Sequence, residues 1–407
     1  MRAAAETIVR ESIQKVLPDA AVKKALEGKT FPGKVILVAA GKAAWQMAKT
    51  AQDCLGSTIT KGIVITKYDH VKGSVGNLAC AEAGHPIPDE NGFRATQEAV
   101  NMVSGLTEED TVLFLLSGGG SALFELPLVP GNELQDITAQ LLACGANIEQ
   151  INTIRKRLSA VKGGRFAKLC MPAQVYCVVL SDVVGDRLDM IASGPACPDS
   201  STCEEALQIV KDYDLHFSEQ ALGLLRKETP KELSNVTTVV TGSVRQLCQA
   251  AKEACEKLGY EVTVLTDTLI CQAREAGVWL GKLAAENAGK GKKIAFIAGG
   301  ETVVKLTGRG KGGRNQELAL AAASYIDGID GVAIFSVGSD GTDGPTDAAG
   351  GYVDWQTAEK LRKQNICIAD VLLENDAYHA LQKVNGLIIT GPTGTNVNDV
   401  AVVLIEK

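Results

Sequence analysis

The chain has 407 residues, and none of its apolar runs approaches the roughly 20 residues that a membrane-spanning helix needs. The segment Met1–Ala21 has no apolar signal-peptide core. Its acidic Glu6 and Glu11 argue against a mitochondrial presequence, which is usually poor in acids. An amphipathic helix with Ile8 and Ile13 on its apolar side is expected there instead. We therefore expect a cytoplasmic protein with no membrane partner.

Basic charge and metal-binding side chains are also scarce. The formal net charge is −7, whereas nucleic-acid-binding proteins usually have a basic face, so no nucleic-acid partner is expected. The 11 cysteines include no Cys-x-x-Cys pair, and only 4 histidines could join them as ligands. This composition favours reduced, mostly buried thiols over a zinc site or a thiol nucleophile. An acidic protein that binds anions must gather its cations locally, as residues 305–314 do.

What the sequence has in quantity is short, continuous apolar runs that alternate with helical stretches. Such runs are typical of strands covered on both faces, and the alternation predicts an α/β fold with doubly wound sheets. A polar segment at 214–236 precedes a fresh strand, which predicts domains of residues 1–235 and 236–407. In sheets of this kind the functional loops follow the carboxyl ends of strands.

Two glycine loops follow predicted strands in the N-terminal half. Gly41 and Lys42 stand where a strand leads into a helix, a position at which free N–H groups attract anions. A second strand leads into the run Ser117, Gly118, Gly119, Gly120 and Ser121. Consecutive glycines let the backbone approach a ligand, and their N–H groups can form an anion-binding nest. An ordinary strand–helix turn is the alternative for the first loop, and a flexible turn for the second.

Acidic side chains follow the strand predicted at 175–180. Asp182 and Asp186 lie just beyond its end, where a carboxylate can accept a proton from a hydroxyl or bind a metal. Turn and cap chemistry is the alternative, since Asp is a common turn former. His85 stands in a proline-rich turn, where a structural or substrate-lining role is favoured over catalysis.

The C-terminal half contains a basic glycine loop at 308–314, within a glycine-rich segment that begins at Gly299. It includes Lys311 and ends at Arg314, at the start of a predicted helix. A cation at a helix N-terminus opposes the macrodipole, so Arg is unfavourable there unless an anion bridges the two. The loop is therefore predicted to bind an anion; a solvated basic loop is the alternative.

An acidic glycine loop at 338–350 follows soon afterwards in the sequence. It contains Asp340 and Asp343 among hydroxyl and glycine residues. Mg²⁺ usually takes one or two carboxylates together with phosphate oxygens, so the loop suits a metal–nucleotide complex. A tight structural loop is the alternative. One basic loop and one acidic loop together favour phosphoryl transfer.

Taken in order, these loops resemble those of the glycerate 2-kinase family, the type with a C-terminal MOFRL domain. The resemblance covers essentially the whole chain. It rests on the motifs Ala40–Ala44, Ala83–Asp89, Leu116–Leu123, Ser181–Asp186, Ile191–Pro195, Gly300–Thr302, Gly312–Glu317, Asp340–Gly350 and Thr393–Asp399. It implies two α/β domains that face each other across a cleft, a Rossmann-like N-terminal one and a smaller C-terminal one with a mixed sheet. It also implies ATP-dependent phosphorylation of D-glycerate at its 2-hydroxyl, and the family's active-site Lys and Arg correspond to Lys42 and Arg314.

We therefore predict a Mg²⁺-dependent kinase that uses ATP and acts as a monomer or homodimer. The predicted catalytic residues are Lys42, Arg314 and Asp182. Substrate or phosphate is expected at Ser117, Gly118, Gly119, Gly120 and Ser121; nucleotide at Gly299, Gly300, Glu301, Lys311 and Gly313; and metal at Asp340, Asp343 and Asp186. Hydroxypyruvate reductase is one alternative, against which the missing dinucleotide fingerprint counts. A non-catalytic binder of phosphorylated sugars is the other.

Overall fold

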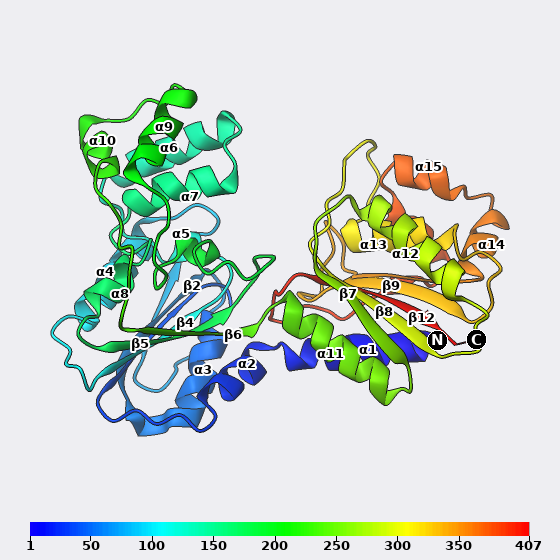
Figure 1. Cartoon of the computed structure of the whole chain (residues 1–407), viewed down its shortest axis with the longest axis horizontal. Helices are drawn as coiled ribbons and strands as arrows, with labels where there is room; N and C mark the ends of the chain where they lie inside the picture. Colours follow the sequence, from blue (N-terminus) through cyan, green and yellow to red (C-terminus); the bar gives the residue numbers. More distant parts are fainter. Residues whose placement is uncertain (407) are drawn as a thin grey trace. The chain divides into compact units, whose positions relative to one another are not determined.

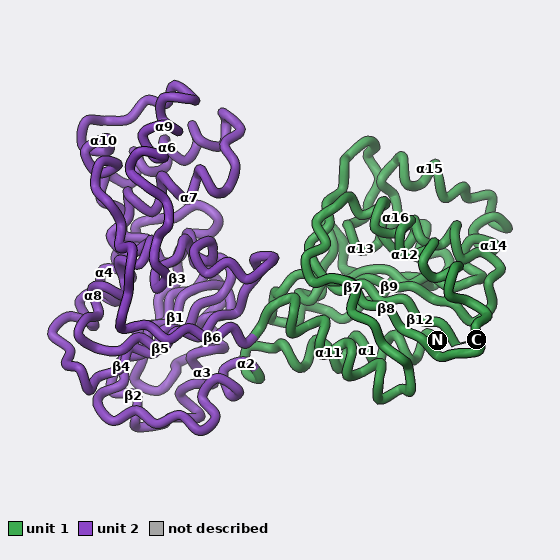
Figure 2. The backbone as a smooth tube through the Cα atoms, viewed as in Figure 1, with its two compact units in different colours: residues 1–20, 242–407 green, residues 21–241 purple. Residues whose placement is uncertain are grey.

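The computed structural model describes residues 1–406, which form two compact units (Figure 2). The first-sheet unit is Ala21–Thr241. The second-sheet unit combines Met1–Ala20 with the chain from Gly242 onward. Each unit has its own six-stranded sheet and its own buried apolar cluster. These compact units group the first twenty residues differently from the predicted domains, 1–235 and 236–407, and those domain boundaries stay a prediction.

The sheet of the first-sheet unit has the order β3-β2-β1-β4-β5-β6. All residues of β1 and β4 are buried, as expected for continuous apolar runs. The pairs that join β1 to β2 and β4, β2 to β3, and β4 to β5 are all parallel. The strands are β1 (Val35–Ala40), β2 (Ile59–Lys67), β3 (Ala79–Ala83), β4 (Thr111–Leu116), β5 (Gln174–Leu180) and β6 (Val236–Gly242).

This strand order contains a topological switch point between β1 and β4. From β1 the chain adds β2 and β3 on one side, and it then crosses to the other side to add β4, β5 and β6. The connections that leave β1 and β4 therefore run in opposite directions, which opens a crevice at the carboxyl ends of these two strands. The loops that begin at Gly41 and Ser117 start at this crevice.

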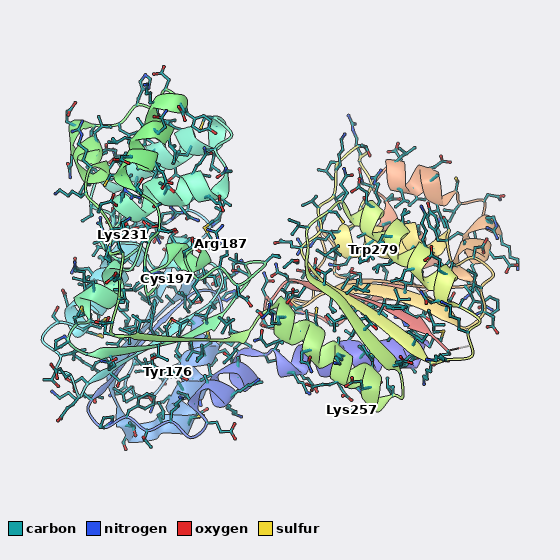
Figure 3. The ribbon with its side chains drawn as sticks, in the orientation of Figure 1. Tyr176, Arg187, Cys197, Lys231, Lys257 and Trp279 are labelled. Carbon is teal, nitrogen blue, oxygen red and sulfur yellow. The ribbon has the colours of Figure 1, made fainter. Side chains whose placement is uncertain are left out.

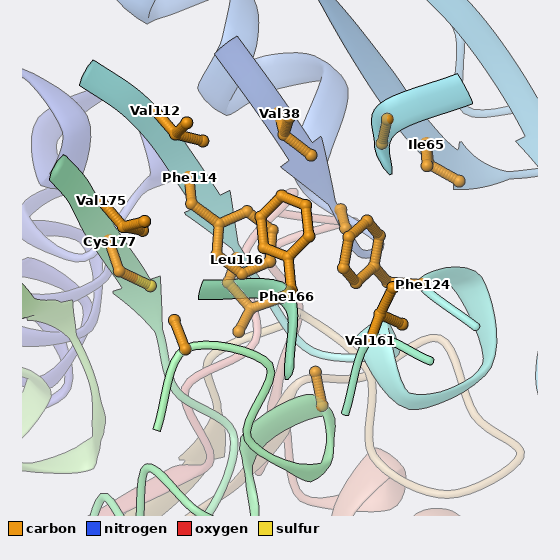
Figure 4. Packing of buried hydrophobic residues seen from close by; sticks show 14 of the residues in the cluster. Val38, Ile65, Val112, Phe114, Leu116, Phe124, Val161, Phe166, Val175 and Cys177 are labelled. Carbon is orange, nitrogen blue, oxygen red and sulfur yellow. The ribbon is translucent and has the colours of Figure 1, made fainter. Parts of the chain in front are cut away.

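Three phenylalanine rings, from β4, from the segment after its glycine loop and from α8 (Arg165–Leu169), pack together in the core (Figure 4). Phe114 lies on β4, Phe124 lies just after the loop, and Phe166 lies in α8. Their ring centroids are 4.9–5.3 Å apart in tilted and edge-to-face arrangements, which aromatic pairs prefer. All three side chains are fully buried. Phe114 and Phe124 flank the loop in the sequence, so the chain is anchored in the core on both sides of it.

Helices cover the first sheet, and a separate group of them forms an appended layer (Figure 1). Apolar residues of α6, α7, α9 and α10 make a small cluster of their own. The helices of this unit are α2 (Pro18–Leu26), α3 (Ala44–Leu55), α4 (Glu90–Met102), α5 (Gly120–Leu123), α6 (Gly131–Ala143), α7 (Ile148–Arg157), α8 (Arg165–Leu169), α9 (Cys203–Asp212) and α10 (Glu219–Leu225), with the 3₁₀ turns η1 (Gly56–Thr58) and η2 (Ile191–Ser193).

The second-sheet unit has the strand order β11-β10-β9-β12-β8-β7. Only β7 and β8 pair in parallel, and the other neighbours are antiparallel, so the sheet is mixed. The strands are β7 (Glu261–Leu269), β8 (Ile294–Gly300), β9 (Val332–Gly338), β10 (Gly350–Asp354), β11 (Leu387–Ile388) and β12 (Asp399–Ile405). The predicted α/β class, with a doubly wound first sheet and a mixed second sheet, is confirmed.

The N-terminal helix α1 (Arg2–Lys15) packs on α11 (Val244–Lys257) in the second-sheet unit (Figure 1). Its apolar residues, including Ile8 and Ile13, are buried, which confirms the predicted amphipathic helix. The carbonyl of Val16 accepts a hydrogen bond from Thr395 Oγ1 at 2.9 Å. The remaining helices are α12 (Ala273–Asn287), α13 (Arg314–Ala323), α14 (Thr357–Arg362), α15 (Ile368–Leu373) and α16 (Ala377–Lys383). Among residues 1–406, no helix has the length and apolar character needed to cross a membrane.

Candidate functional site

The loop after β1 is held against the loop after β4 by close backbone contacts. Gly41 has a φ of +123°, and a side chain there would overlap the backbone of Ser117. The N–H of Lys42 donates to the Gly118 carbonyl at 2.9 Å, and the N–H of Ala43 donates to Ser117 Oγ at 3.1 Å. Only glycine at position 41 permits this approach. The backbone of Lys42 is thereby fixed beside the predicted anion-binding loop, and the buried Ser117 helps to fix it.

The loop Ser117–Ser121 presents N–H groups that have no partner in the protein. Gly119 adopts the left-handed conformation, with φ 85° and ψ −6°, at the start of α5. Within residues 1–406, the N–H groups of Gly118, Gly119 and Ser121 have no hydrogen-bond acceptor. Successive N–H groups in a turn of this kind form a concave site for an anion. The arrangement suits a carboxylate or a phosphate.

The side chains of Lys42, His85 and Asp182 lie close to the same glycines. A Cβ atom at Gly118 would overlap the carboxylate of Asp182, and one at Gly119 would lie 3.1 Å from both Lys42 Cγ and the His85 ring. The structure therefore brings together Lys42, Asp182 and the loop Ser117–Ser121, and it adds His85. Burial lowers the pKa of His85, and the charges of Lys42 and Lys67 lower it further. His85 is thus a neutral imidazole at pH 7, able to donate or accept one hydrogen bond beside the loop.

The loop after β5 carries a second acid with an unused oxygen. Asp186 has a φ of +51°, and its Oδ1 atom is shielded from solvent without a hydrogen-bond partner among residues 1–406. The neighbouring Arg187, labelled in Figure 3, forms ion pairs with Glu149 and, at 2.9 Å, with Asp189. A buried carboxylate oxygen without a partner is costly unless a ligand or water satisfies it. Asp186 therefore fits the predicted role of a metal ligand.

In the second-sheet unit, Arg314 is the first residue of α13 and is held by two carboxylates. Its Nε and Nη2 atoms donate to the two oxygens of Asp399 at 2.5 and 3.1 Å, and its Nη1 atom lies 3.1 Å from Glu301 Oε1. The fork-shaped pairing with Asp399 fixes the guanidinium plane. Glu301 in turn accepts a hydrogen bond from Asn398 at 3.2 Å. The arginine that was expected to need an anion at the helix N-terminus thus has carboxylates of the chain itself beside it.

The ionisation of this cluster favours a formed ion pair at neutral pH. Burial raises the pKa of Asp399 to about 6, although Arg314 acts to lower it. Burial also acts to lower the pKa of Arg314, but the hydrogen bonds and charge of Asp399, with the charge of Glu301, raise it overall. Asp399 is therefore ionised at pH 7 and becomes protonated in mildly acidic solution. The sequence motifs did not identify this residue: Asp399 ends the motif Thr393–Asp399, and no individual function was predicted for it.

The two acids of the 338–350 loop have different surroundings. Asp343 is buried, and its two oxygens accept the N–H groups of Asn315 at 3.1 Å and Gln316 at 2.9 Å, in the first turn of α13. Asp340 Oδ1 accepts the N–H of Thr342 at 2.9 Å, and Gly338 lies beside it. A carboxylate that stabilises a helix N-terminus has less capacity for a metal. The predicted metal role is therefore better supported at Asp340 than at Asp343.

The residues predicted to bind nucleotide make packing and cation–ring contacts within the second-sheet unit. Gly299 and Gly300 leave no room for a side chain, because a Cβ would overlap Cys248 or the backbone of Leu269. Gly313 packs in the same way on Asp343. Lys311 Nζ lies 4.4 Å from the centroid of the Tyr378 ring. The two strand-end glycines thus have a packing role, and their nucleotide contacts stay a prediction.

No group of three His, Cys, Asp or Glu side chains within the described residues could hold a metal ion by itself. All eleven cysteines are free thiols. Burial raises the pKa of Cys170, Cys177, Cys248 and Cys255 to about 12, so these four stay protonated. A kinase site does not need a three-ligand cluster, because Mg²⁺ can take the phosphate oxygens of its nucleotide.

Comparisons with known proteins identify relatives over the whole chain. Residues 4–226 match the family described as a domain of unknown function, DUF4147, and residues 294–399 match the MOFRL family. The D-glycerate 2-kinase of Thermotoga maritima is 52% identical over 98% of this chain and 97% of its own length. The glycerate 2-kinase of Pyrococcus horikoshii is 40% identical over 94% and 90%.

Solved structures agree with these sequence relatives. A crystal structure of glycerate kinase from Thermotoga maritima superposes with a TM-score of 0.96 at 51% identity, covering 99% of each chain. Two Agrobacterium vitis relatives at 36% identity carry a hydroxypyruvate reductase name. The more similar relatives are named as kinases, and the fold matches that of a glycerate kinase over nearly the whole chain. The chain belongs to the glycerate 2-kinase family, as its motifs predicted.

Proposed function

We propose that this protein transfers the γ-phosphoryl group of ATP to the 2-hydroxyl of D-glycerate, giving 2-phosphoglycerate and ADP. The observation that carries the proposal is the convergence of Lys42, Asp182 and the Ser117–Ser121 loop at the switch point of the first sheet. A cation, a carboxylate and a row of N–H groups are what transfer to a hydroxyl of an anionic substrate requires. Close relatives named as kinases support the same reaction.

Each group has a distinct task in the proposed reaction. The N–H groups of Gly118, Gly119 and Ser121 hold the substrate carboxylate, and Asp182 accepts the proton of the 2-hydroxyl. The hydroxyl oxygen then forms a bond to the γ-phosphorus, while the bond from that phosphorus to the β–γ bridging oxygen breaks and its electrons leave with ADP. Lys42 stabilises the charge on the transferring group. Catalysis of this kind depends on positioning and charge stabilisation more than on covalent chemistry.

Arg314 is the second proposed cation. A guanidinium has five N–H donors, and the contacts with Asp399 and Glu301 occupy three of its N–H groups. At least two donors therefore remain for a carboxylate or phosphate. The fixed plane of Arg314 favours a bidentate contact with such a group. Lys311 and the loop at 299–313 are proposed to contact the nucleotide.

A magnesium ion is the proposed metal, and it would neutralise phosphate charge while ATP is bound. Asp186 in the first-sheet unit and Asp340 in the second-sheet unit are each proposed, separately, as a carboxylate ligand. The Oδ1 atom of Asp186 fits this role because it is buried without a partner among the described residues. Asp343 is the weakest of the three candidates, since α13 already occupies both of its oxygens. We also propose a cytoplasmic location, which the eleven free thiols support, and a monomer or homodimer.

The test is ³¹P and ¹H NMR of the purified protein with D-glycerate, ATP and Mg²⁺. We expect 2-phosphoglycerate and ADP to form together. If 3-phosphoglycerate formed instead, the enzyme would be a kinase but the proposed position of the hydroxyl would be wrong. Oxidation of NADH by hydroxypyruvate in the absence of ATP would favour the reductase. Tight binding of glycerate without turnover in folded protein would favour the non-catalytic binder.

A further inference from the structure

A fully buried lysine lies behind the Ser117–Ser121 loop and was not singled out by any sequence motif. Lys162 follows α7 in the first-sheet unit and has no solvent exposure. Its ammonium donates to the carbonyl of Ser121 at 2.9 Å, to that of Phe124 at 3.1 Å and to that of Ala192 at 3.4 Å. These three acceptors match the three donors of an ammonium group. One cation thus joins the end of the glycine loop to the 3₁₀ turn η2.

Two more buried charges accompany Lys162. Arg155 Nη2 donates to the same Ser121 carbonyl at 2.9 Å. The carboxylate of the fully buried Glu125 lies 3.5 Å from Lys162 Nζ and 3.8 Å from Arg155 Nη2, and neither of its oxygens accepts a hydrogen bond among the described residues. Two cations therefore face one anion. The excess positive charge lies behind a loop that is proposed to bind an anion.

The turn that Lys162 reaches also packs directly on the loop. Ala192 and Ser193 have φ values of 50° and 60°, which residues other than glycine adopt only when their surroundings hold them there. A Cβ on Gly120 would approach the Ala192 side chain to 2.8 Å. The bond from Lys162 to the Ala192 carbonyl is one of the restraints on this turn. Loss of the ammonium would free both the turn and the loop end that contacts it.

We propose that Lys162 is a positioning residue for substrate binding, one that orients the Ser117–Ser121 loop from behind and adds positive potential there. By bonding the carbonyl oxygen of Ser121 on the buried side, the ammonium orients the loop so that the N–H groups of Gly118, Gly119 and Ser121 stay available to a ligand. The buried charge is little screened and attracts the substrate carboxylate. This inference rests on the proposed function of the loop, which the experiment below tests separately.

The protonation of Lys162 supplies a readout that a purely structural lysine would not give. Burial lowers the pKa of Lys162 to about 8, with Glu125 acting to raise it and Arg155 to lower it. Arg155 and Glu125 are the charged groups that face the ammonium, and η2 contributes a carbonyl. Above pH 8 the neutral amine has one donor fewer and no charge. The KM for D-glycerate should therefore rise above this pH in the wild-type enzyme.

The experiment compares steady-state kinetics across pH 6.5 to 9.5 for the wild type and Lys162→Met, which keeps most of the side-chain volume. We expect Lys162→Met to raise the KM for D-glycerate at pH 7 about tenfold, with a smaller effect on kcat, because the loop acts mainly in binding. Its KM should no longer depend on pH above 8. Lys162→Arg retains a charge throughout this range, so its KM should also lack the alkaline rise.

Lys156→Met is the matched control, since Lys156 is also buried but pairs with Asp199. Its KM should stay within about twofold of the wild-type value.

Glu125→Gln provides a second test if Lys162→Met does not fold. Removing the carboxylate while keeping the ammonium should lower the pKa of Lys162, so the rise in KM should begin at lower pH than in the wild type. A wild-type KM and pH profile in Lys162→Met, or an unmoved profile in Glu125→Gln, would overturn the inference.

Gly119→Ala distinguishes an error in the role of Lys162 from an error in the proposal that the Ser117–Ser121 loop binds substrate. An alanine there would face left-handed strain and the side chains of Lys42 and His85. If Gly119→Ala raises the KM for D-glycerate and Lys162→Met does not, the loop binds substrate and the role of Lys162 is wrong. If neither variant changes the KM, the loop assignment fails, and the inference about Lys162 fails with it.

Discussion

Lys42 in the first-sheet unit and Arg314 in the second-sheet unit are the two predicted catalytic cations, and they are held in different ways. Lys42 is fixed through its backbone, which bonds Gly118, and within residues 1–406 its ammonium has no hydrogen-bond or ion-pair partner. The guanidinium of Arg314 is instead fixed by its own contacts with Asp399 and Glu301. Lys42 can meet an anion directly, whereas Arg314 offers fewer donors in a preset plane.

This difference has an energetic consequence. An ion pair that includes a buried carboxylate becomes destabilising when its cation is removed, because the carboxylate is left without compensation. The side chain of Asp399 is only 8% exposed, whereas the contacts of Lys42 within the protein would survive truncation of its side chain. Mutations at the two cations should therefore affect activity alike and stability differently.

The largest combined effect is expected from Arg314→Ala. Activity should fall roughly 10³-fold, on the scale of other cations in phosphoryl transfer. The free energy of unfolding should also fall, because Asp399 and Glu301 lose their partner. Enzyme kinetics and chemical denaturation measure the two effects. Arg362→Ala, which removes an exposed arginine paired with Asp327, is the control and should change neither by much. If Arg314→Ala were as stable as the wild type, the proposed difference between the two cations in their effect on stability would be wrong.

Lys42→Ala should show the activity loss without the stability loss. We expect a drop of roughly 10³-fold in kcat/KM and a melting temperature within about 2 °C of the wild type. The control is Lys49→Ala in α3, which removes an exposed lysine paired with Asp53. If Lys42→Ala and Arg314→Ala both kept wild-type activity, the assignment of the catalytic site would be wrong.

A smaller effect is expected from Asp399→Asn. At pH 7 activity should fall about tenfold, because a charge-assisted hydrogen bond contributes about 1.5 kcal/mol or more. In the wild type, activity should also fall as pH drops through about 6, where Asp399 becomes protonated. Asp399→Asn should lack this acid limb. If the loss of activity below about pH 6 persisted unchanged in Asp399→Asn, another titrating group would be responsible for it.

The ionisation of Asp399 should change stability and activity in opposite directions as pH rises. The pKa of Asp399 in the folded protein is raised above its usual 3.8, so folding favours the protonated carboxyl. The stability that this group contributes therefore decreases as pH rises from about 4 to about 6. Activity should rise over the same window. Denaturation of the wild type and Asp399→Asn at pH 5 and pH 7 would isolate the contribution of Asp399.

Local patterns in the sequence were sufficient to predict the strands and the loops that follow them. The apolar run at β4 and the three glycines after it predicted a buried strand and a backbone site for an anion, and the structure contains both features. Burial of a strand and the conformational freedom of glycine depend mainly on neighbouring residues, so they can be recognised in a short segment. The resemblance of the motifs to those of a kinase family also predicted the reaction.

Contacts between distant residues were not predictable in the same way. The pairing of Arg314 with Asp399 spans 85 positions, and Lys162 bonds Ser121 across 41. Lys162 stands in none of the family motifs, and the motif Thr393–Asp399 gives no sign that Asp399 pairs with Arg314. The location of Met1–Ala20 in the second-sheet unit likewise depends on packing against α11.

The α/β class, the strand-end glycine loops and the family to which the chain belongs could all be recognised from the residues alone. Which loops meet and which charges are compensated became clear from the folded chain. The order β3-β2-β1-β4-β5-β6 places Lys42 beside Gly118 and Gly119, and folding buries Lys162 behind them. The physical reason is that strand order and burial are set by the packing of the whole unit, whereas helices, strands and turns reflect the preferences of adjacent residues.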